Sequence, residues 1–422
     1  MIDRYRTKAM SEIWGREAKY RRWTEVEVAI CQAHADEGTI PADDMRQIKE
    51  KANFDLARCD EIEKETKHDL AAFVRNLDET IGPAGRWVHF GATSYDVIDT
   101  ALGMMLRDSC DVLVASAERL HEQIIRLARE HAETPMIGRT HGVHAEPITF
   151  GLKCAGWRHE LERNIARLED TREQVAYGKI SGPVGVHASV SHVMEAKICA
   201  GLGLKHEPVS TQIINRDRHA LFMNTLALTG AGLERIATEL RNLQRTEILE
   251  VQEGFEKGQT GSSSMPHKRN PWSSETVVGL ARLLRSNAHA MLETVATWHE
   301  RDLTNSSLER VVLPDSCCLL DFMLNRLTSV LEKLEVNKEN MARNLRQMGD
   351  LVYSEHLMSA LIKSGMGRQD AYKIAQRNAA KAWDGEDYKT CVMADEEVKG
   401  RLSQEELQEV FSLEHHLRNA NG

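Results

Sequence analysis

The distribution of proline constrains the fold of this chain more than any other feature of its sequence. The chain has 422 residues but only 9 prolines. None lies between Pro208 and Pro266, and none follows Pro314. Because proline removes a backbone donor and clashes with the preceding turn of a helix, these gaps leave room for long helices. The chain is therefore predicted to be almost wholly α-helical.

The spacing of apolar residues favours the same fold. Apolar side chains recur every three or four residues, as on the buried face of a helix. They form three stripes: Leu113, Ala117, Leu120, Ile124 and Leu127; Leu161, Ile165 and Leu168; and Leu233, Ile236, Leu240, Leu243, Ile248 and Val251, with Glu247 as the one break. We find no comparable alternation of strands with hairpin turns. Small residues in the stripes allow close helix packing, which in long bundles often continues between subunits.

Three helical domains are expected from this pattern. Residues 1–111 form an N-terminal domain, residues 112–364 a central bundle of long helices, and residues 365–422 a small C-terminal domain. The last boundary is placed at the glycines of "SGMG", residues 364–367. A polar loop, residues 258–271, interrupts the central bundle, because its glycines and prolines do not support a helix.

Composition excludes several classes of function. The net charge of −10 argues against a general nucleic-acid binder, which needs an excess of Lys and Arg on one face. The 8 cysteines are scattered without a C-x-x-C pair, which is typical of a reduced, cytoplasmic protein. The N-terminal "MIDRYRTKAM" has no apolar core of a signal peptide, and no apolar run approaches a membrane span.

Six polar segments interrupt the helical pattern. They are "DRYR" (3–6), "TKHD" (66–69), "VHFGATSYD" (88–96), "GRTHGVHAEP" (138–147), "STQIINRDRHA" (210–220) and "WHERDLTNSSLER" (298–310). Each has a structural explanation: a frayed terminus, a solvated helix face, a helix cap, a strained turn, a cap followed by solvated charge, or a charged helix end. Each also offers acid–base or anion-binding groups, since helix N-termini and clustered arginines bind anions.

The histidines of the fourth segment raise the question of a metal site. His141 and His144 have H-x-x-H spacing, but they lack the helical i, i+4 spacing and a cysteine partner. We therefore expect no metal there, and a histidine in a polar turn is a better general acid or base. No Gly-rich dinucleotide or P-loop motif is present, and no cofactor is expected.

The stretch "GSSSMPHKRNP", residues 261–271, has the densest cluster of small polar and cationic groups. Glycines at 254, 258 and 261 would permit a mobile lid, with serines and Lys268 at hand to stabilise negative charge. The alternative is a flexible connection between two helices. Composition alone leaves both possibilities open.

This stretch matches the pattern G-S-x-x-M-P-x-K-x-N-P and resembles the signature of the fumarase/aspartase superfamily. Together with "DRY", "KHD", "RTHGVHAEP", "STQ…RDRHA" and "WHERDLTNSS…R", the chain resembles the adenylosuccinate lyase family, of the shorter bacterial type, over nearly its whole length. The resemblance implies a three-domain helical fold, a homotetramer with shared active sites, no cofactor and no metal. It also implies β-elimination of fumarate from adenylosuccinate, which gives AMP, and from SAICAR, which gives AICAR.

The resemblance also implies roles for individual residues. Ser262 corresponds to the general base, His141 to the general acid, and Glu275 to a carboxylate that orients a histidine. Lys268 and Asn270, with Thr93, Ser94 and Ser263, would hold the carboxylates of the fumarate part. The remaining substrate contacts would come from Arg4, Tyr5, Lys67, His68, Asp69, His89, Gln212, Arg301, Ser306 and Arg310. Lys268 and His68 would also belong to the catalytic residues. Ser264 is assigned no role.

Two other functions remain open at this stage. A sister lyase acting on argininosuccinate, aspartate or malate would not need the phosphate-binding cluster of Arg4 and Tyr5 with Arg301 and Arg310. A non-catalytic helical scaffold would not need Ser262 or His141. Release of fumarate from each candidate substrate separates these functions.

Overall fold

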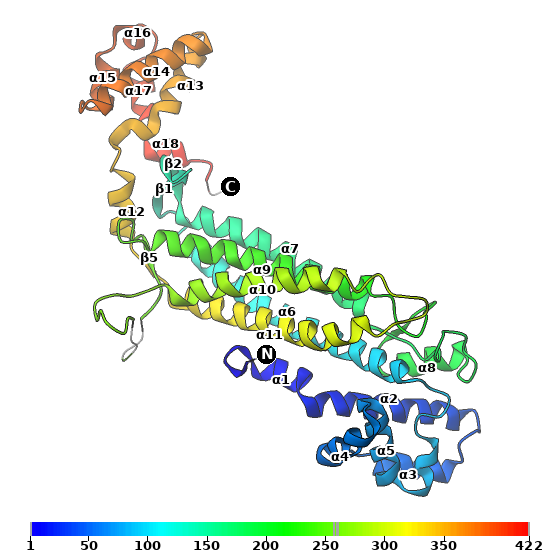
Figure 1. Ribbon diagram of the computed structural model, residues 1–422. Coiled ribbons are helices and arrows are strands. Elements are labelled where there is room, and N and C mark those ends of the chain that lie inside the picture. Colours follow the sequence, from blue (N-terminus) through cyan, green and yellow to red (C-terminus); the bar gives the residue numbers. More distant parts are fainter. Residues whose placement is uncertain (1, 256–257, 259–260, 421–422) are drawn as a thin grey trace. The chain divides into compact units, whose positions relative to one another are not determined.

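The computed structural model describes residues 2–255, 258 and 261–420 (Figure 1). Residues 259 and 260 of the predicted polar loop lie outside the described residues. Helices dominate the described ranges, and the strands are short, so the predicted all-α class is confirmed. None of the helices in these ranges combines the length and the hydropathy needed to cross a membrane.

The chain divides into two compact units, and each takes several segments of the sequence. The first unit comprises residues 1–119, 161–235 and 276–327, and the second comprises residues 120–160, 236–275 and 328–422. Five long helices contribute residues to both: α6 (Ser94–Glu130), α7 (Phe150–Val175), α9 (Asp217–Leu243), α10 (Trp272–Leu292) and α11 (Thr304–Glu332). The predicted boundaries at residues 111 and 364 are a different division of the chain and stay a prediction.

The first unit also holds the N-terminal helices. Its other elements are η1 (Asp3–Tyr5), α1 (Lys8–Trp14), α2 (Arg16–Asp36), α3 (Ala42–Lys51), α4 (Leu56–Thr66), α5 (Asp69–Ile81), η2 (Pro83–Trp87), β3 (Tyr177–Gly178), α8 (His192–Gly201) and β4 (Lys205–His206). An apolar core joins α2, α5 and the start of α6, with Trp23 and Phe73 among its buried members. This core fixes the turns between the helices, where several candidate residues lie.

Within the first unit, the long helices are tied by apolar contacts and by buried hydrogen bonds. Ser116 Oγ of α6 donates to Asp321 Oδ1 of α11 at 2.6 Å, and the hydroxyls of Thr171 and Thr225 pair α7 with α9 at 2.9 Å. A Cβ added at Gly230 of α9 would lie 2.5 Å from Leu284 of α10. The absence of a side chain at Gly230 thus allows α9 and α10 to pack closely.

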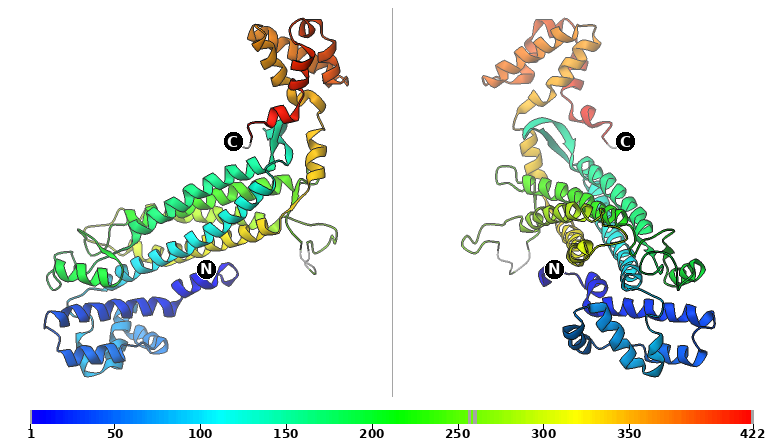
Figure 2. Two further views of the ribbon diagram at one scale, coloured as in Figure 1. Left: turned by 180° about the vertical axis from the view of Figure 1, so that it is seen from behind. Right: turned by 45° about the vertical axis from the view of Figure 1, so that its right-hand side comes forward.

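The second unit contains the remaining strands and the C-terminal helices. Its elements are β1 (Pro135–Thr140), β2 (Val143–Thr149), β5 (Val251–Gln252), β6 (Glu335–Val336), α12 (Lys338–Leu345), η3 (Gly349–Tyr353), α13 (Ser354–Lys363), α14 (Arg368–Trp383), α15 (Tyr388–Ala394), α16 (Glu396–Lys399), α17 (Gln404–Val410) and α18 (Leu413–Leu417). Figure 2 shows α13 to α17 gathered into one small cluster. The apolar core of this cluster includes Leu357 and Leu361, which precede the predicted boundary.

The apolar stripes are confirmed in part. Leu113, Ala117, Leu120, Ile124 and Leu127 are all buried in α6, and α11 continues through Pro314. The third stripe is wrong beyond Leu243, where α9 ends. Leu249 adopts a left-handed φ of 45°, and side-chain amides of Asn344 and Asn340 hold the carbonyls of Ile248 and Leu249 at 2.8 Å each. Those carbonyls are satisfied outside a helix, so the chain can turn and enter β5.

The segment predicted as a loop at 138–147 is a β-hairpin, which corrects the expectation of no hairpin. His141 and Gly142 connect β1 to β2 with φ values of 55° and 78°, as in the type I′ turn of two-residue hairpins. The register shifts between Ile137 and Arg139. This irregularity hides the strand alternation in the sequence, because a bulge moves side chains to the other face.

Candidate functional site

The candidate residues fall into two groups, one in each unit. The first unit holds Arg4, Tyr5, Lys67, His68, Asp69, His89, Thr93, Ser94, Gln212, Arg301, Ser306 and Arg310. The second unit holds His141, Ser262, Ser263, Lys268, Asn270 and Glu275.

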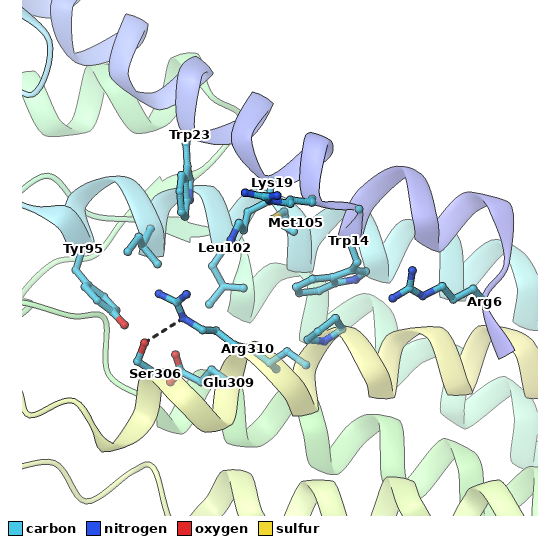
Figure 3. Close-up of a pocket in the computed structure, with 15 residues that line it drawn as sticks. Arg6, Trp14, Lys19, Trp23, Tyr95, Leu102, Met105, Ser306, Glu309 and Arg310 are labelled. Carbon is cyan, nitrogen blue, oxygen red and sulfur yellow. Dashed lines mark hydrogen bonds between the residues drawn. The ribbon is translucent and has the colours of Figure 1, made fainter. Parts of the chain in front are cut away.

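A cavity of about 430 Å³ in the first unit includes two of the predicted residues (Figure 3). Ser306 and Arg310 of α11 form part of its wall, and Tyr95 of α6 lies beside them. The cavity is lined by Arg6, Trp14, Gly15, Arg16, Lys19, Trp23, Tyr95, Ile98, Leu102, Met105, Ser306, Glu309, Arg310, Leu313 and Pro314. It combines apolar walls with several cations, and its size lies in the range of small-molecule sites.

Arg310 is the centre of the polar wall of this cavity. Its Nη1 donates to Asp69 Oδ2 at 2.6 Å, and its Nε donates to Ser306 Oγ at 3.4 Å. Burial opposes ionisation of Asp69, but the ion pair with Arg310 lowers the pKa of that carboxyl. Asp69 therefore stays charged and holds Arg310 in place, while the rest of the guanidinium remains available to an anion.

Lys19 of α2 adds a second cation to this wall. Burial lowers the pKa of its ammonium group; nearby Arg310 lowers it further, and Asp69 only partly compensates. Lys19 and Arg310 therefore place excess positive charge in a partly buried position. A bound anionic group would reduce the repulsion between these two cations. No sequence pattern singled out Lys19, because it lies on an ordinary charged helix.

Arg301 and Gln212 form a second predicted pair in the same unit. Arg301 Nη1 donates to Gln212 Oε1 at 2.8 Å, and the Arg301 guanidinium stacks 3.6 Å from the ring centre of Tyr95. Tyr95 therefore connects this pair to the wall with Ser306, although the sequence analysis assigned it no role. Its place within "VHFGATSYD" was the signal that could have found it.

The "TKHD" segment is a turn between two helices rather than a solvated helix face. Lys67 closes α4 in a left-handed conformation, and His68 caps α5 by accepting the Ala71 N–H at its Nδ1, 3.3 Å away. Nε2 of a neutral His68 therefore carries the proton, and the side chain is half exposed. Asp69 begins α5 and pairs with Arg310. This turn therefore places His68 next to the cation wall, which is the side of the cavity formed by Lys19, Ser306 and Arg310.

His89 and Thr93 lie in the turn before α6, and Ser94 is the first residue of that helix. His89 has a φ of 63°, and Glu27 accepts its ring Nδ1–H at 2.7 Å and its backbone N–H at 2.9 Å. Burial disfavours the imidazolium, but the bond from the His89 ring to Glu27 and the negative charge of Glu27 raise the pKa of His89. The Asp96 carboxylate in the first turn of α6 accepts the Thr93 N–H at 2.8 Å, as the N3 side chain of a capping box does. The cap by the hydroxyl of Thr93 or Ser94 stays a prediction.

Arg4 and Tyr5 are not brought to this cluster within the chain. The Tyr5 ring packs edge-on against Phe322, with ring centres 5.1 Å apart, and Arg4 is exposed. Arg6 lines the cavity instead.

A buried charge network in the first unit was missed by sequence reasoning. Arg216, expected in solvated charge, is only 2% exposed. It donates to both oxygens of Asp99 at 2.7 and 2.9 Å and of Glu309 at 2.7 and 3.1 Å. A buried cation of this kind needs such partners. The network joins α6, α11 and the start of α9, and Glu309 also lines the cavity.

We expect this network to make stability depend on pH. His219 lies beside it, and burial together with Arg216 lowers its pKa to about 4. The unfolded state binds a proton near the ordinary value of about 6.5, so the free energy of unfolding falls as pH drops from about 6.5 to about 4. His219→Gln should flatten this slope by about 1 kcal/mol per pH unit. Urea unfolding at pH 7 and pH 5 measures the difference, with the exposed His206→Gln as control; equal slopes for all three proteins would contradict the assignment.

In the second unit, the β1–β2 hairpin presents His141 at its tip, exposed to solvent. Arg139 fixes the hairpin through a bidentate pair with the buried Glu250, at 2.8 and 3.0 Å. The Pro147 carbonyl accepts a bond from His416 Nε2 at 2.9 Å. The turn is thus held at its base while the imidazole remains accessible, which suits a residue that gives a proton to a substrate.

The signature segment of the second unit surrounds Ser262. Ser262 Oγ accepts the backbone N–H groups of Met265 at 3.1 Å and Ser264 at 3.4 Å. Asn270 Nδ2 donates to the Gly261 carbonyl at 3.0 Å, and a Cβ at Gly261 would lie 2.2 Å from the Lys268 carbonyl. The segment is therefore a tight turn that requires glycine at 261, and Lys268 and Ser263 are exposed on it.

The same segment is anchored at its C-terminal end. Glu253 caps α10 by accepting the N–H groups of Ser273 and Ser274 at 3.2 and 2.8 Å. Gln244 donates to the Arg269 carbonyl at 3.2 Å. Glu275 is exposed in the first turn of α10. Across the part of the second unit that the structure describes, no hydrogen bond or ion pair joins His141 to Ser262 or to Glu275.

Two family models match most of the chain. Residues 4–284 match the family model described as Lyase, and residues 350–422 match that of the Adenylosuccinate lyase C-terminus. The chain is 48% identical to the adenylosuccinate lyase of Synechocystis sp., over 99% of this chain and 98% of that protein. It is 45% identical to that of Bacillus subtilis, over 100% and 98% of the two chains.

Solved structures show the same fold. The fumarate lyase from Mesorhizobium sp. BNC1 matches with a TM-score of 0.90 at 28% identity, covering 100% of this chain and 97% of that one. The 3-carboxy-cis,cis-muconate lactonizing enzyme from Pseudomonas putida matches with a TM-score of 0.89 at 29% identity, covering 99% and 95%. The full-length identity distinguishes among these relatives, and the chain belongs to the adenylosuccinate lyase family.

Proposed function

We propose that this protein is an adenylosuccinate lyase, which releases fumarate from adenylosuccinate to give AMP and from SAICAR to give AICAR. The family membership over the whole chain supports this function. The observation that carries the mechanism is the pair of backbone N–H groups that point at Ser262 Oγ. They would stabilise the alkoxide that a serine needs to act as a base.

In the proposed reaction, the Ser262 alkoxide takes the proton from the succinyl carbon beside the carboxylate. The resulting dianionic aci-carboxylate needs cations and donors, which Lys268, Asn270 and Ser263 would supply. His141 gives a proton to the departing nitrogen of the purine ribotide, so that the C–N bond breaks without forming an unstable amide anion. Glu275 would orient a histidine in the assembled site.

The cation wall of the first unit would hold the ribotide. Arg301, Ser306 and Arg310 would bind its phosphate, together with Arg4, Tyr5, Lys67 and His68. Gln212 would bind the succinyl part. Tyr95 and Lys19 join this set on the strength of their contacts. The remaining proposed substrate contacts are Asp69 and His89, with Thr93 and Ser94 at the carboxylates of the fumarate part.

We expect Arg310→Gln to raise the KM for adenylosuccinate with little change in kcat. The phosphate is remote from the bond that breaks, so its contacts contribute equally to ground and transition states. A hydrogen bond to a charged group contributes about 1.5–3 kcal/mol, or about 10- to 100-fold in KM. The exposed Arg75→Gln serves as control, since Arg75 pairs with the surface glutamates Glu65 of α4 and Glu79 of α5.

A second substrate makes this test specific to the phosphate. Succinyladenosine, which lacks the phosphate, should be a poor substrate of the unaltered protein and should lose nothing further in the Arg310→Gln variant. An equal loss on both substrates would show that Arg310 does not hold the phosphate.

Assembly and location form part of the proposal. A homotetramer would build each site from three chains, and the protein would act in the cytoplasm, with neither nucleic acid nor membrane as partner.

Fumarate release from adenylosuccinate, argininosuccinate, aspartate and malate, measured with a chelator present, tests the function. Turnover of adenylosuccinate alone is expected; turnover of another substrate in its place, or of none, would contradict the proposal.

A further inference from the structure

Three side chains outside the proposed catalytic and substrate groups converge in the first unit. His187 lies in the loop after β3, and His192 and Glu195 lie three residues apart in the first turn of α8. One ligand atom of each lies within 4.8 Å of the others, and the three form the one such group among the described residues. No sequence pattern indicates this cluster, because the loop after β3, and not a regular spacing, brings His187 to α8.

Glu195 is the unusual member of this cluster. Its side chain is completely buried, and its Oε1 accepts the Ile180 N–H at 2.7 Å. Among the residues that the structure describes, its Oε2 has no hydrogen-bond partner, although a buried carboxylate oxygen without a partner is costly. This oxygen is the atom that faces His187 Nε2, 3.7 Å away.

The orientation of His187 places a second acceptor opposite this oxygen. Its Nδ1 lies 3.1 Å from the Val190 carbonyl, and a carbonyl only accepts, so Nδ1 carries the proton. In the neutral ring, Nε2 then presents a lone pair toward Glu195 Oε2. A cation between these two acceptors satisfies both: a proton on Nε2 does so for His187 and Glu195 alone, and a metal ion does so together with His192. Donation of the other ring N–H to a backbone carbonyl is also how proteins orient a metal-binding histidine.

We infer that His187, His192 and Glu195 form a binding site for a divalent transition-metal ion, with Zn²⁺ as the best match. Two imidazoles and a carboxylate are a ligand set typical of zinc and disfavour Mg²⁺ and Ca²⁺, which take oxygen ligands. With metal–ligand bonds of about 2.0–2.1 Å, tetrahedral ligand atoms lie about 3.3 Å apart. His187 Nε2 and Glu195 Oε2 need to approach by only about 0.4 Å for that geometry. The ring of His192 is exposed and lies 3.7 Å from that of His187, centre to centre.

Occupation of this site would tie the loop to α8. The loop also reaches Gln212, whose Nε2 donates to the Pro183 carbonyl at 3.0 Å. The ion would thus stiffen a segment next to a proposed substrate residue without entering the acid–base chemistry. The inference is independent of the proposed function, because it rests only on these three side chains.

Calorimetric titration of the metal-free full-length protein with Zn²⁺ tests the site. The eight cysteines are buried, and burial raises the pKa of each thiol, so they compete little in the folded protein. We expect one tight site per chain. His192→Ala should weaken it at least about 100-fold, since even loss of an outer partner of a ligand typically costs 10- to 100-fold.

Two further variants make the result decisive. Glu195→Gln keeps an oxygen to accept the Ile180 N–H but loses the charge, and it should weaken binding as strongly. His206→Ala removes an exposed histidine of β4 outside the cluster and should bind as the unaltered protein does. Absence of a tight site, or unchanged affinity in His192→Ala, would overturn the inference even if Glu195→Gln failed to fold.

Discussion

Replacement of Ser262 by alanine is expected to lower kcat for adenylosuccinate by at least about 10²-fold, the contribution of one positioned general base. The Ser262 hydroxyl would receive the proton from carbon, and the two N–H groups at its oxygen would have nothing to stabilise in the variant. Substrate binding should remain largely intact, because the hydroxyl is needed for proton removal rather than for holding the ground state. Steady-state turnover and equilibrium binding of adenylosuccinate measure the two quantities separately.

Ser264 offers a matched control in the same turn. Only its backbone N–H contacts Ser262 Oγ, so Ser264→Ala keeps that bond and should retain turnover. If Ser262→Ala stays within a few-fold of the unaltered protein, another group is the base. If Ser264→Ala loses as much, the turn rather than the Ser262 hydroxyl is what matters.

Replacement of His141 is expected to have an effect of similar size, because the departing nitrogen would then lack its proton donor. Asparagine is the appropriate substitute: His141 has a φ of 55°, and asparagine tolerates this left-handed conformation better than alanine. His141→Asn should therefore keep the hairpin turn while losing the acid. An unchanged circular dichroism spectrum with retained activity would remove His141 from the mechanism.

The two inactive variants should restore activity when mixed. If different chains of a tetramer supply Ser262 and His141 to one site, co-refolded equal amounts of Ser262→Ala and His141→Asn proteins contain some sites with both residues. Random assembly gives roughly a quarter of the sites, since each of two independent contributors is intact about half the time. Confirmed subunit exchange without recovery of activity would place both residues in one chain.

The elements that the sequence predicts well are those determined by local periodicity. The stripe from Leu113 to Leu127 is buried along α6 because one helix face repeats through the whole segment. The pattern in the sequence also extended the third stripe to Ile248 and Val251, although α9 ends at Leu243. There the side-chain amides of Asn340 and Asn344, nearly a hundred residues away, decide against a helix.

The same distinction applies to the candidate site. Motifs in the sequence identified Asp69, Arg301 and Arg310, and the structure gives each of them a contact with another candidate or with Tyr95. Lys19 was missed because only packing lowers its pKa and brings it to Asp69 and Arg310. Arg216 was taken for solvated charge, because its buried partners Asp99 and Glu309 lie far away in the chain. Long-range pairing of charges leaves no local pattern to read.

Hydrogen exchange into the substrate distinguishes the role of Ser262 as the base from the role of His141 as the acid. Adenylosuccinate is incubated in D₂O with each variant, and proton NMR follows the methylene hydrogens beside the carboxylate. We expect His141→Asn to exchange one of these hydrogens without cleaving the C–N bond, because the base is intact and only the proton donor is lost. We expect no exchange with Ser262→Ala. Deuterium incorporation by Ser262→Ala at the rate shown by His141→Asn would contradict the assignment of Ser262 as the base.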